Sequence, residues 1–468
     1  MDEGAGSTAS AAGGADEPDG GGRGAGEAVV DRRRTPAAAP RPSMAPPAWA
    51  AWILLVAFPV GHLVTVDVAG AVATGADVAV LLLLAAAGLD RLSRGPRRGE
   101  ATFRFTLGVV VLALFGGWIA LSGLWGFHPE YAVAKGAGTV GLALAAGALA
   151  GSGLGWRRSV EAWLLGTALA LVFTMVVLLT GPTVVRWRVL YQGGGVVGLP
   201  LPRVSGPFLH PNMLGDYLVV SGALLWGIWP SLEDRVRGGA WALAGMVAVG
   251  LLLSASSAWV GAGLVLFGVG RWHAGARGEE RSLLGVPTLV SLAGFLLASI
   301  AMVALLLPLD LSVAGRSVQT GGIRPAIWGS AFHAFLEAPV QGVGAAPYLA
   351  AVVDPLRGGP AALWDAHNSY LSVLGQFGLL GAGLAVVGFT LLVQGGGFRR
   401  PRLPGRRATD PEPSPPPPAR LRTALVLAGA AVAVHGLFLA GEDLRHVWLL
   451  AGVWGAAGGG VILERVRR

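Results

Sequence analysis

The stretch "AWALAGMVAVGLLLSASSAWVGAGLVLFGVG", from Ala240 to Gly270, decides how this chain is folded. A single helix of these 31 residues would be about 46 Å long, which exceeds the ~30 Å of hydrocarbon in a bilayer. Two helices, broken at Ser254–Ser257, would each be rather short. The stretch is therefore one membrane span or two, and the answer fixes the side of the membrane on which every later segment lies.

The rest of the chain is apolar as well. Its 468 residues are 53% hydrophobic and only 13% charged, which is far too apolar for an ordinary soluble protein. Repeated apolar runs of about 18 residues or more match the length of a membrane-spanning helix. The sequence thus predicts an all-α fold, a polytopic integral membrane helix bundle, with spans at roughly 48–66, 70–89, 103–123, 132–151, 160–181, 212–230, 240–255, 256–270, 285–307, 368–394, 423–440 and 446–463.

The basic residues favour two spans over one in the stretch 240–270. Cytoplasmic loops of membrane proteins carry the excess of Lys and Arg. With two spans, 27 of the 35 basic residues lie on the cytoplasmic side and 8 lie outside. With one span, everything after it inverts and the most basic loop faces outward. We therefore predict about 12 transmembrane helices, with both termini in the cytoplasm.

This layout divides the chain into four regions. Residues 1–46 are Gly, Ala, Pro and charged residues without an apolar run, which predicts a disordered cytoplasmic tail. The membrane domain follows at 47–394, then a Pro- and Arg-rich cytoplasmic linker at 395–422, and 423–468 hold the last two transmembrane helices and the cytoplasmic C-terminus. Topology explains the net charge of +8, so no nucleic-acid partner is expected. The lack of cysteine excludes disulfides, thiolate metal sites and a cysteine nucleophile.

Two large segments outside, 181–211 and 308–366, hold the polar residues that could do chemistry. In the first, Arg186, Arg188 and Arg203 lie outside against the charge bias. Arginines in such a place are candidate ligands for an anion, because a guanidinium binds phosphate in a bidentate manner. The alternative is that they only anchor the loop to lipid phosphate.

Each outside segment also contains a predicted helix start. The first ends in His210-Pro211-Asn212, and Pro is favoured at the first position of a helix. In the second, apolar residues that include Trp328 recur at helical spacing from Arg324 to Glu337, which predicts a short interfacial helix on the membrane surface. Arg324 stands at its N-terminus, where a guanidinium and backbone N–H groups together favour an anion. The alternative is a surface arginine without a ligand.

The second outside segment leads into "DAHNSYLSVLGQFGLLG", from Asp365 to Gly381. If a helix starts near Asp365, His367 and Tyr370 share one of its faces with Leu371 and Leu374. That arrangement points His367 toward the bundle at the depth of the lipid headgroups. A lone histidine is usually structural, but the arginines on the neighbouring outside loops favour a catalytic role.

Three blocks of sequence occur in a fixed order over about 180 residues: "RVSGPFLHPNMLGDYL", "GIRPAIWGSAFHAFLEAPVQGVG" and "DAHNSYLSVLGQFGLLG". Together they resemble the O-antigen ligase and polymerase superfamily of membrane glycosyltransferases. The matching residues are Arg203, Gly206, Phe208 and His210 to Asn212, then Arg324, Trp328, Pro339, Gly342 and Gly344, and last His367, Asn368, Tyr370, Leu371 and Gly378.

The resemblance implies an enzyme of cell-surface polysaccharide assembly in the cytoplasmic (inner) membrane. Such an enzyme moves a glycan from a polyprenyl diphosphate carrier to an acceptor hydroxyl at the extracytoplasmic face. Its partners would be the lipid-linked glycan donor, a glycan or lipid-glycan acceptor, and the lipid bilayer. His367 would take the proton of the attacking hydroxyl, and a single displacement would invert the anomeric centre.

The resemblance also implies roles for the other candidate residues. The departing diphosphate needs charge neutralisation, for which guanidinium groups are suited. Its ligands would be Arg203 and Arg324, with Arg186 and Arg188 behind them. Substrate would be positioned by His210, Asn212, Asn368, Tyr370 and Trp328. No cofactor is expected, and no metal site either, because the sequence has no Asp-x-Asp pair and few outside acids.

Two positions depart from the family pattern. Ser257 stands where the family commonly has an arginine, and Gln376 stands where it commonly has an acidic residue. The second departure leaves His367 without its most obvious carboxylate partner, unless Asp365 or the Glu442–Asp443 pair replaces it.

Two other functions stay open at this point. A transporter, including the bicarbonate-uptake role sometimes attached to members of the superfamily, would need ionisable groups within spans, for which Asp216 and His435 are candidates. A noncatalytic partner in glycan assembly would tolerate the loss of His367. The sequence also leaves open whether the enzyme is a ligase, a polymerase or a protein O-glycosylation enzyme, because these differ in the acceptor.

Overall fold

The computed structural model describes the chain in segments. Most of the predicted tail and most of the predicted linker at 395–422 lie outside them. The described residues are 44–68, 71–94, 107–181, 190–196, 199–208, 210–277, 293–294, 312–313, 316–317, 320–346, 350–352, 362–364, 366–393, 417–437 and 445–457.

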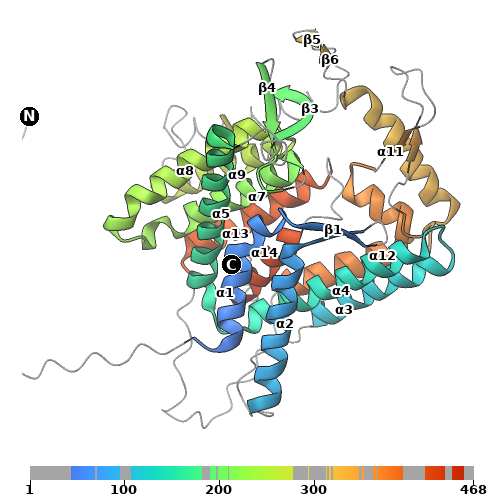
Figure 1. The fold of residues 1–468 in the computed structure, drawn as a ribbon, viewed down its shortest axis with the longest axis horizontal. Coiled ribbons are helices and arrows are strands. Elements are labelled where there is room, and N and C mark those ends of the chain that lie inside the picture. Colours follow the sequence, from blue (N-terminus) through green and yellow to red (C-terminus); the bar gives the residue numbers. More distant parts are fainter. Residues whose placement is uncertain are drawn as a thin grey trace, which may run out of the picture. The chain divides into compact units, whose positions relative to one another are not determined.

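Helices dominate the described residues (Figure 1). Eleven of the twelve predicted spans coincide with a described helix, while the span predicted at 285–307 lies outside the described residues except for 293–294. The eleven are α1 (Pro46–Gly61), α2 (Gly75–Arg94), α3 (Leu107–Leu121), α4 (Pro129–Gly151), α5 (Gly155–Thr180), α7 (Pro211–Ile228), α8 (Asp234–Ser254), α9 (Ala258–Arg277), α12 (Ser369–Val393), α13 (Ala419–His435) and α14 (Arg445–Ala456). The predicted interfacial helix is α11 (Thr320–Glu337), which begins four residues earlier than expected.

Six helical segments among the described residues are long and apolar enough to cross a membrane, by length and composition. A polytopic membrane helix bundle is therefore confirmed, whereas the total of about 12 spans and the sides on which the termini lie stay predictions. The six segments are Leu107–Leu124, Pro129–Gly151, Gly155–Thr180, Pro211–Ser231, Asp234–Ser254 and Ser369–Leu392.

The stretch 240–270 is broken where its serines predict a break. α8 ends at Ser254, Ala255 adopts a left-handed backbone conformation with φ 43°, and α9 begins at Ala258. The Ser254 hydroxyl donates back to the Leu251 carbonyl at 2.7 Å, and the Ser256 hydroxyl accepts the Ala258 N–H at 3.3 Å. These side chains bond to backbone groups that the two helix ends leave open, so they stabilise the break.

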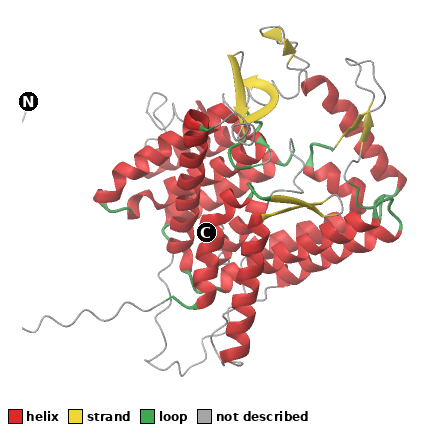
Figure 2. Cartoon of the chain, viewed as in Figure 1, coloured by secondary structure: helices red, strands yellow, loops and turns green. Residues whose placement is uncertain are grey.

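Short antiparallel hairpins occur in the connections between helices (Figure 2). Two of the segments predicted to lie outside contain three of them, which the all-α prediction did not include. Because each described sheet has only two strands, the helices still determine the fold. The strands pair as β1 (Thr65–Val68) with β2 (Ala71–Thr74), β3 (Leu190–Val196) with β4 (Leu199–Val204), β5 (Ser312–Val313) with β6 (Arg316–Ser317), and β7 (Ala350–Val352) with β8 (Ala362–Trp364).

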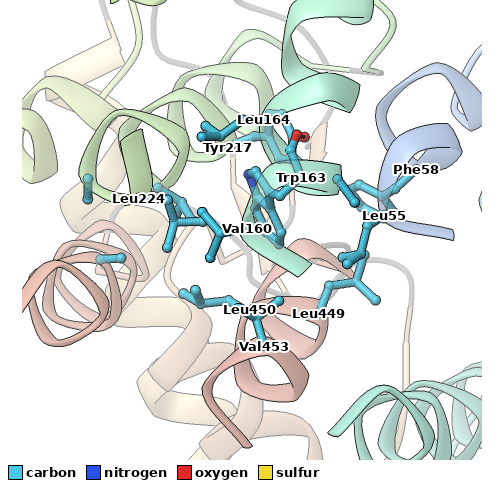
Figure 3. Close-up of a cluster of buried hydrophobic side chains, with 14 of the residues drawn as sticks. Leu55, Phe58, Val160, Trp163, Leu164, Tyr217, Leu224, Leu449, Leu450 and Val453 are labelled. Atoms are coloured by element: carbon cyan, nitrogen blue, oxygen red, sulfur yellow. Dashed lines mark hydrogen bonds between the residues drawn. The ribbon is translucent and has the colours of Figure 1, made fainter. Parts of the chain in front are cut away.

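The largest hydrophobic cluster joins α5, α7 and α14 (Figure 3). Trp163 of α5 stacks on Tyr217 of α7, with ring centroids 5.1 Å apart and planes inclined by 15°. The Trp163 indole N–H donates to the Ser221 hydroxyl at 2.9 Å, one turn further along α7. Leu449 and Val453 of α14 belong to the same cluster. This packing fixes α7, whose first residues belong to the candidate site.

α12 contains a second break, at Gly378. This residue has φ 62° and ψ −166°, a region of backbone conformation that is essentially restricted to glycine. The break frees the N–H groups of Leu379 and Leu380, which donate instead to the carbonyls of Pro339 and Val340 at 2.9 and 3.1 Å. A segment just after α11 therefore supplies the acceptors that α12 lacks.

The carbonyls before the break are satisfied in the same way. Those of Gly375 and Gln376 accept the N–H groups of Val343 and Gly344 at 2.9 and 3.0 Å, and that of Phe377 accepts the Trp118 indole N–H at 3.0 Å. Irregular backbone at membrane depth is tolerated where protein groups pair with it. Four residues that matched the family thus have a structural role, because they build the contact between the 339–344 segment and α12: Pro339, Gly342, Gly344 and Gly378.

Candidate functional site

The first family block forms a compact junction at the start of α7. His210 is the N-cap of this helix, because its Nδ1 accepts the backbone N–H of Asn212 at 3.1 Å. Arg203, from β4, donates through Nη2 to the Asn212 Oδ1 at 3.1 Å and through Nε to the carbonyl of Ser254 at 3.0 Å. The arginine thus ties β4 to the start of α7 and to the end of α8, and its guanidinium is held in one orientation.

His210 also shows which other groups lie close to this junction. Its side chain is largely buried, and burial, followed by electrostatic interactions with Arg203, His367 and His435, lowers its pKa from 6.5 to about 3. The imidazole is therefore neutral at physiological pH. Charge interactions of this kind weaken with distance, so Arg203, His367 and His435 all lie in the neighbourhood of His210.

The third family block begins differently from the prediction. α12 starts at Ser369 rather than near Asp365, and the Asn368 Oδ1 accepts the N–H groups of Tyr370 and Leu371 at 3.0 and 3.1 Å. Asn368 is thus the N-cap of the helix. His367 lies before the helix, so the prediction that it shares a helix face with Tyr370, Leu371 and Leu374 is wrong. The reason is that an Asn side chain competes for the first backbone donors and sets the helix start.

His367 has a left-handed backbone conformation, with φ 44°. For a residue other than glycine this conformation costs about 1–2 kcal/mol, and the surrounding structure must stabilise it. Strained residues of this kind occur preferentially at functional sites. The conformation therefore adds support to His367 as a functional residue, independently of the family pattern.

The start of α12 is docked on the end of α13. The Ser369 N–H donates to the carbonyl of Gly436 at 2.8 Å, and the Tyr370 hydroxyl donates to the carbonyl of Ala433 at 2.6 Å. The Tyr370 side chain is thus engaged in packing two helices together. These bonds bring the His367 backbone next to the end of α13, where His435 lies.

Gln376 does not serve His367. It is buried, its Nε2 donates to the Ser372 hydroxyl at 2.7 Å, and its Oε1 accepts from Lys135 Nζ at 3.3 Å and from the Ala346 N–H at 3.2 Å. Gln376 is more than two turns along α12 from His367 and holds α4 and the segment after α11. The residues considered as substitutes for a carboxylate at 376, Asp365 and the Glu442–Asp443 pair, lie outside the described residues.

The second family block is described only in part. Trp328 is partly buried on α11, on the side that also carries the buried Ile327 and Ala331. Phe332 and Leu336 of the predicted apolar face are about half exposed. Arg324 belongs to α11, but its side chain lies outside the described residues, and so do Arg186 and Arg188.

One group of residues was not assembled by sequence reasoning. The carboxylate of Asp216, on α7, lies between two imidazoles: Oδ1 is 2.8 Å from Nδ1 of His435, and Oδ2 is 2.6 Å from Nε2 of His446. The Ser257 hydroxyl is 2.7 Å from Nε2 of His435. We call these four buried residues the Asp216 cluster. The imidazole of His435, from α13, thus lies beside Ser257, the position at which the family commonly has an arginine.

The signal for the Asp216 cluster in the sequence was weak. Asp216 and His435 are isolated polar residues within apolar runs, and they drew attention only as candidates for transport. His446 was missed. Asp216 is 219 residues from His435 and 230 residues from His446 in the chain, so no local spacing could pair them.

Comparison with known protein families matches residues 217–386 to the family described as O-antigen ligase. The match spans a little over a third of the chain and includes α11, His367, Asn368 and the break at Gly378. Arg203, His210 and Asn212 precede it. A search of the curated proteins found no match. Residues 217–386 of this polytopic membrane protein are therefore an O-antigen ligase domain.

Proposed function

We propose that this enzyme moves a glycan from a polyprenyl diphosphate carrier to an acceptor hydroxyl at the extracytoplasmic face of the cytoplasmic membrane. The observation that carries the proposal is the junction at the start of α7, where Asn212 and the Ser254 carbonyl hold Arg203 close to the N-cap His210, in a chain with an O-antigen ligase domain. His367 is close enough to this junction to affect the pKa of His210. A fixed cation next to imidazoles suits a reaction in which a phosphate leaves and a hydroxyl loses its proton.

Arg203 is the proposed ligand of the departing diphosphate. A guanidinium remains charged at any physiological pH, and its bonds to Asn212 and to the Ser254 carbonyl hold it in one orientation before substrate binds. Preorganised charge of this kind stabilises negative charge in the transition state without reorganisation. Arg324, Arg186 and Arg188 are proposed as further ligands of the same diphosphate.

His367 is the proposed general base. In one displacement, the acceptor oxygen attacks the anomeric carbon, its proton passes to the imidazole of His367, and the bond from the anomeric carbon to the diphosphate oxygen breaks. The electron pair leaves with the diphosphate. A single displacement inverts the anomeric configuration. General-base catalysis by a histidine contributes typically about 10²- to 10⁴-fold.

The remaining residues are proposed to position these two. Asn212 holds the guanidinium of Arg203, and Asn368 caps the helix that follows His367. With His210, Tyr370 and Trp328, these residues form the set that we propose to position the substrate. We propose that no metal ion takes part, because the arginines supply the positive charge.

The test is a transfer assay on purified protein in detergent or nanodiscs, with a polyprenyl-diphosphate-linked glycan as donor. His367→Asn is the most informative variant, because asparagine tolerates a left-handed backbone better than alanine does. We expect kcat to fall about 10²- to 10⁴-fold with an unchanged thermal midpoint. Arg203→Lys keeps the charge but not the paired geometry, and we expect it to lower kcat as well.

Two outcomes would contradict the assignment. A wild-type kcat in His367→Asn would exclude His367 as the general base. Retention of the anomeric configuration in the product would exclude a single displacement. The assay also separates ligase from polymerase, since a second copy of the donor glycan serves as acceptor only for a polymerase.

A transporter is the second candidate, and the Asp216 cluster is the observation that favours it, because ionisable groups within membrane helices often mark transport pathways. A deletion strain distinguishes the two functions. Accumulation of lipid-linked glycan supports the enzyme, whereas loss of solute uptake without such accumulation supports transport. A noncatalytic assembly partner would keep its function in the His367→Asn variant.

A further inference from the structure

The Asp216 cluster lies directly next to the proposed transfer site and is not part of it. Asp216 is one helical turn from Asn212, the residue that holds Arg203. Ser257 is three residues beyond Ser254, whose carbonyl accepts from the same arginine. The Asp216 cluster thus joins, through short stretches of backbone, the two groups that fix the orientation of Arg203.

The Asp216 cluster is connected to His367 in a similar way. His435 is the last residue of α13, and the next carbonyl, that of Gly436, accepts the N–H of Ser369 at the start of α12. His367 lies two residues earlier. One backbone hydrogen bond, from Ser369 to Gly436, therefore joins the segment that carries His435 to the segment that carries His367.

Hydrogen-bond chemistry restricts the state of the Asp216 cluster. An ionised carboxylate only accepts hydrogen bonds, so both histidines must donate an N–H to Asp216. A neutral His435 then carries its proton on Nδ1, which leaves Nε2 to accept from the Ser257 hydroxyl at 2.7 Å. The carboxylate thus selects one tautomer and one ring orientation of His435.

Stability alone does not explain why such a group is buried. Asp216 and His446 are each 1% exposed and His435 is 0% exposed. Replacing a buried charged cluster by apolar residues of similar volume is often neutral or stabilising, so a buried carboxylate is weak evidence for a stabilising role. Among the described residues, no group of three or more such side chains is arranged to hold a metal ion. A geometric role is the one that the connections of the Asp216 cluster to Arg203 and to the segment of His367 support.

We propose that the Asp216 cluster is a positioning device for glycan transfer: Asp216 fixes His435, and His435 with Ser257 sets Arg203 and His367 at the separation that the reaction requires. The inference rests on the proposed function of these two residues. None of the four residues of the Asp216 cluster touches the substrate. Their effect is on the geometry of the groups that do.

The test compares two variants on the same helix. Asp216→Asn keeps the volume but offers one acceptor oxygen and one donor group, so one imidazole must change its tautomer or lose its bond. Ser221→Ala is the matched control: it removes the buried hydrogen bonds of another α7 side chain, to Trp163, Thr167 and the Tyr217 carbonyl, away from the site. We expect both variants to lower the thermal midpoint, and only Asp216→Asn to lower kcat, at least about tenfold.

A split between kcat and KM identifies positioning. The KM for the donor should stay within about twofold of the wild-type value in Asp216→Asn, because an effect confined to the transition state lowers kcat alone when substrate binding is unchanged. Two variants of His435 separate its bonds. His435→Asn keeps an N–H toward Asp216 and loses the group that faces Ser257, whereas His435→Gln does the reverse. Both should lose kcat, because the link requires both bonds.

The outcomes that overturn the inference differ from those that overturn the proposed function. If the wild-type protein transfers glycan and His367→Asn does not, wild-type kcat in Asp216→Asn or in either His435 variant refutes positioning by the Asp216 cluster. A similar fall of kcat in Ser221→Ala also refutes it, since the effect is then general loss of stability. If Asp216→Asn does not fold, the two His435 variants decide, and failure of all three to fold shows a purely structural role. If the wild-type protein itself transfers no glycan from the donor, the proposed function fails first.

Discussion

Gly378→Ala tests the break in α12 most directly. The residue lies at the contact between α12 and the 339–344 segment, with φ 62° and ψ −166°. A Cβ at this position would collide with the carbonyl oxygen of Val340 and lie 2.6 Å from the backbone nitrogen of Gly342. Because both neighbours are backbone atoms, they cannot move aside as the end of a flexible side chain could.

The expected loss of stability has two parts. The backbone conformation costs an alanine about 1–3 kcal/mol. The 339–344 segment must also withdraw, which disrupts the bonds from Leu379 and Leu380 to Pro339 and Val340, at about 0.5–1.5 kcal/mol for each bond. The substitution should therefore cost roughly 2–6 kcal/mol in total.

The assay is thermal unfolding in detergent, followed by tryptophan fluorescence at one fixed heating rate. The chain has no cysteine for thiol-reactive dyes but 16 tryptophans, of which Trp118 and Trp125 donate to the carbonyls of Phe377 and Gly342 at this contact. The fixed rate matters because unfolding of large membrane proteins is often irreversible. We expect a midpoint several degrees lower, together with a change in the emission of the folded protein.

Gly383→Ala is the matched control, since a Cβ at Gly383 on the same helix meets no atom within 4 Å. Alanine is the better helix former by about 1 kcal/mol, so this variant should be neutral or slightly more stable. An unchanged midpoint in Gly378→Ala, or an equal loss in both variants, would refute the break and the role given to the 339–344 segment.

Three further predictions concern the site. The pKa of His210 is lowered from an ordinary 6.5 to about 3, so below about pH 6.5 the unfolded chain binds a proton that the folded protein does not. Stability should therefore fall as the pH drops through this window. Thermal midpoints at pH 7.5 and 5 should show a smaller fall in His210→Asn, which keeps a capping side chain. Asn368→Ala should lower stability by about 1 kcal/mol through loss of the cap of α12, and Asn368→Asp should restore it, whereas equal midpoints for the two variants would exclude the cap. Glycan transfer should continue at the wild-type rate in the presence of a chelator, and loss of activity that Mg²⁺ or Mn²⁺ restores would contradict the metal-independent mechanism.

Much of the helical layout could be predicted from the sequence, because spans and breaks are local properties. The serines at 254 and 256 lie where the charge distribution required a break, and hydroxyls near a helix end bond to backbone groups a few residues away. Pro211 likewise predicted the start of α7 correctly, because proline is favoured at the first position of a helix. The hairpins between helices were not foreseen, since short pairings in loops leave little trace in the periodicity of apolar residues.

The site could be predicted less well, even where its residues were named correctly. The spacing of "DAHNSYL" is compatible with a helix from Asp365, and only the competing bonds of Asn368 move the start to Ser369 and leave His367 in a left-handed conformation. The contacts of Gln376 also depend on the tertiary structure. Its partners are Lys135, Ser372 and Ala346, and the first of these is 241 residues away in the chain.

The sequence by itself thus determined that this is a polytopic membrane helix bundle, where most of its helices lie, and which three blocks resemble the O-antigen ligase family. Hydrophobicity, charge bias and turn propensity are properties of single residues and their neighbours in the chain, so they can be assessed without knowledge of the fold. Only the tertiary structure decided that Asp216 meets His435 and His446, that Arg203 is held by the ends of two helices, and that α12 is broken by a segment that follows α11. These contacts depend on how helices pack, and packing brings together side chains that no spacing along the chain relates.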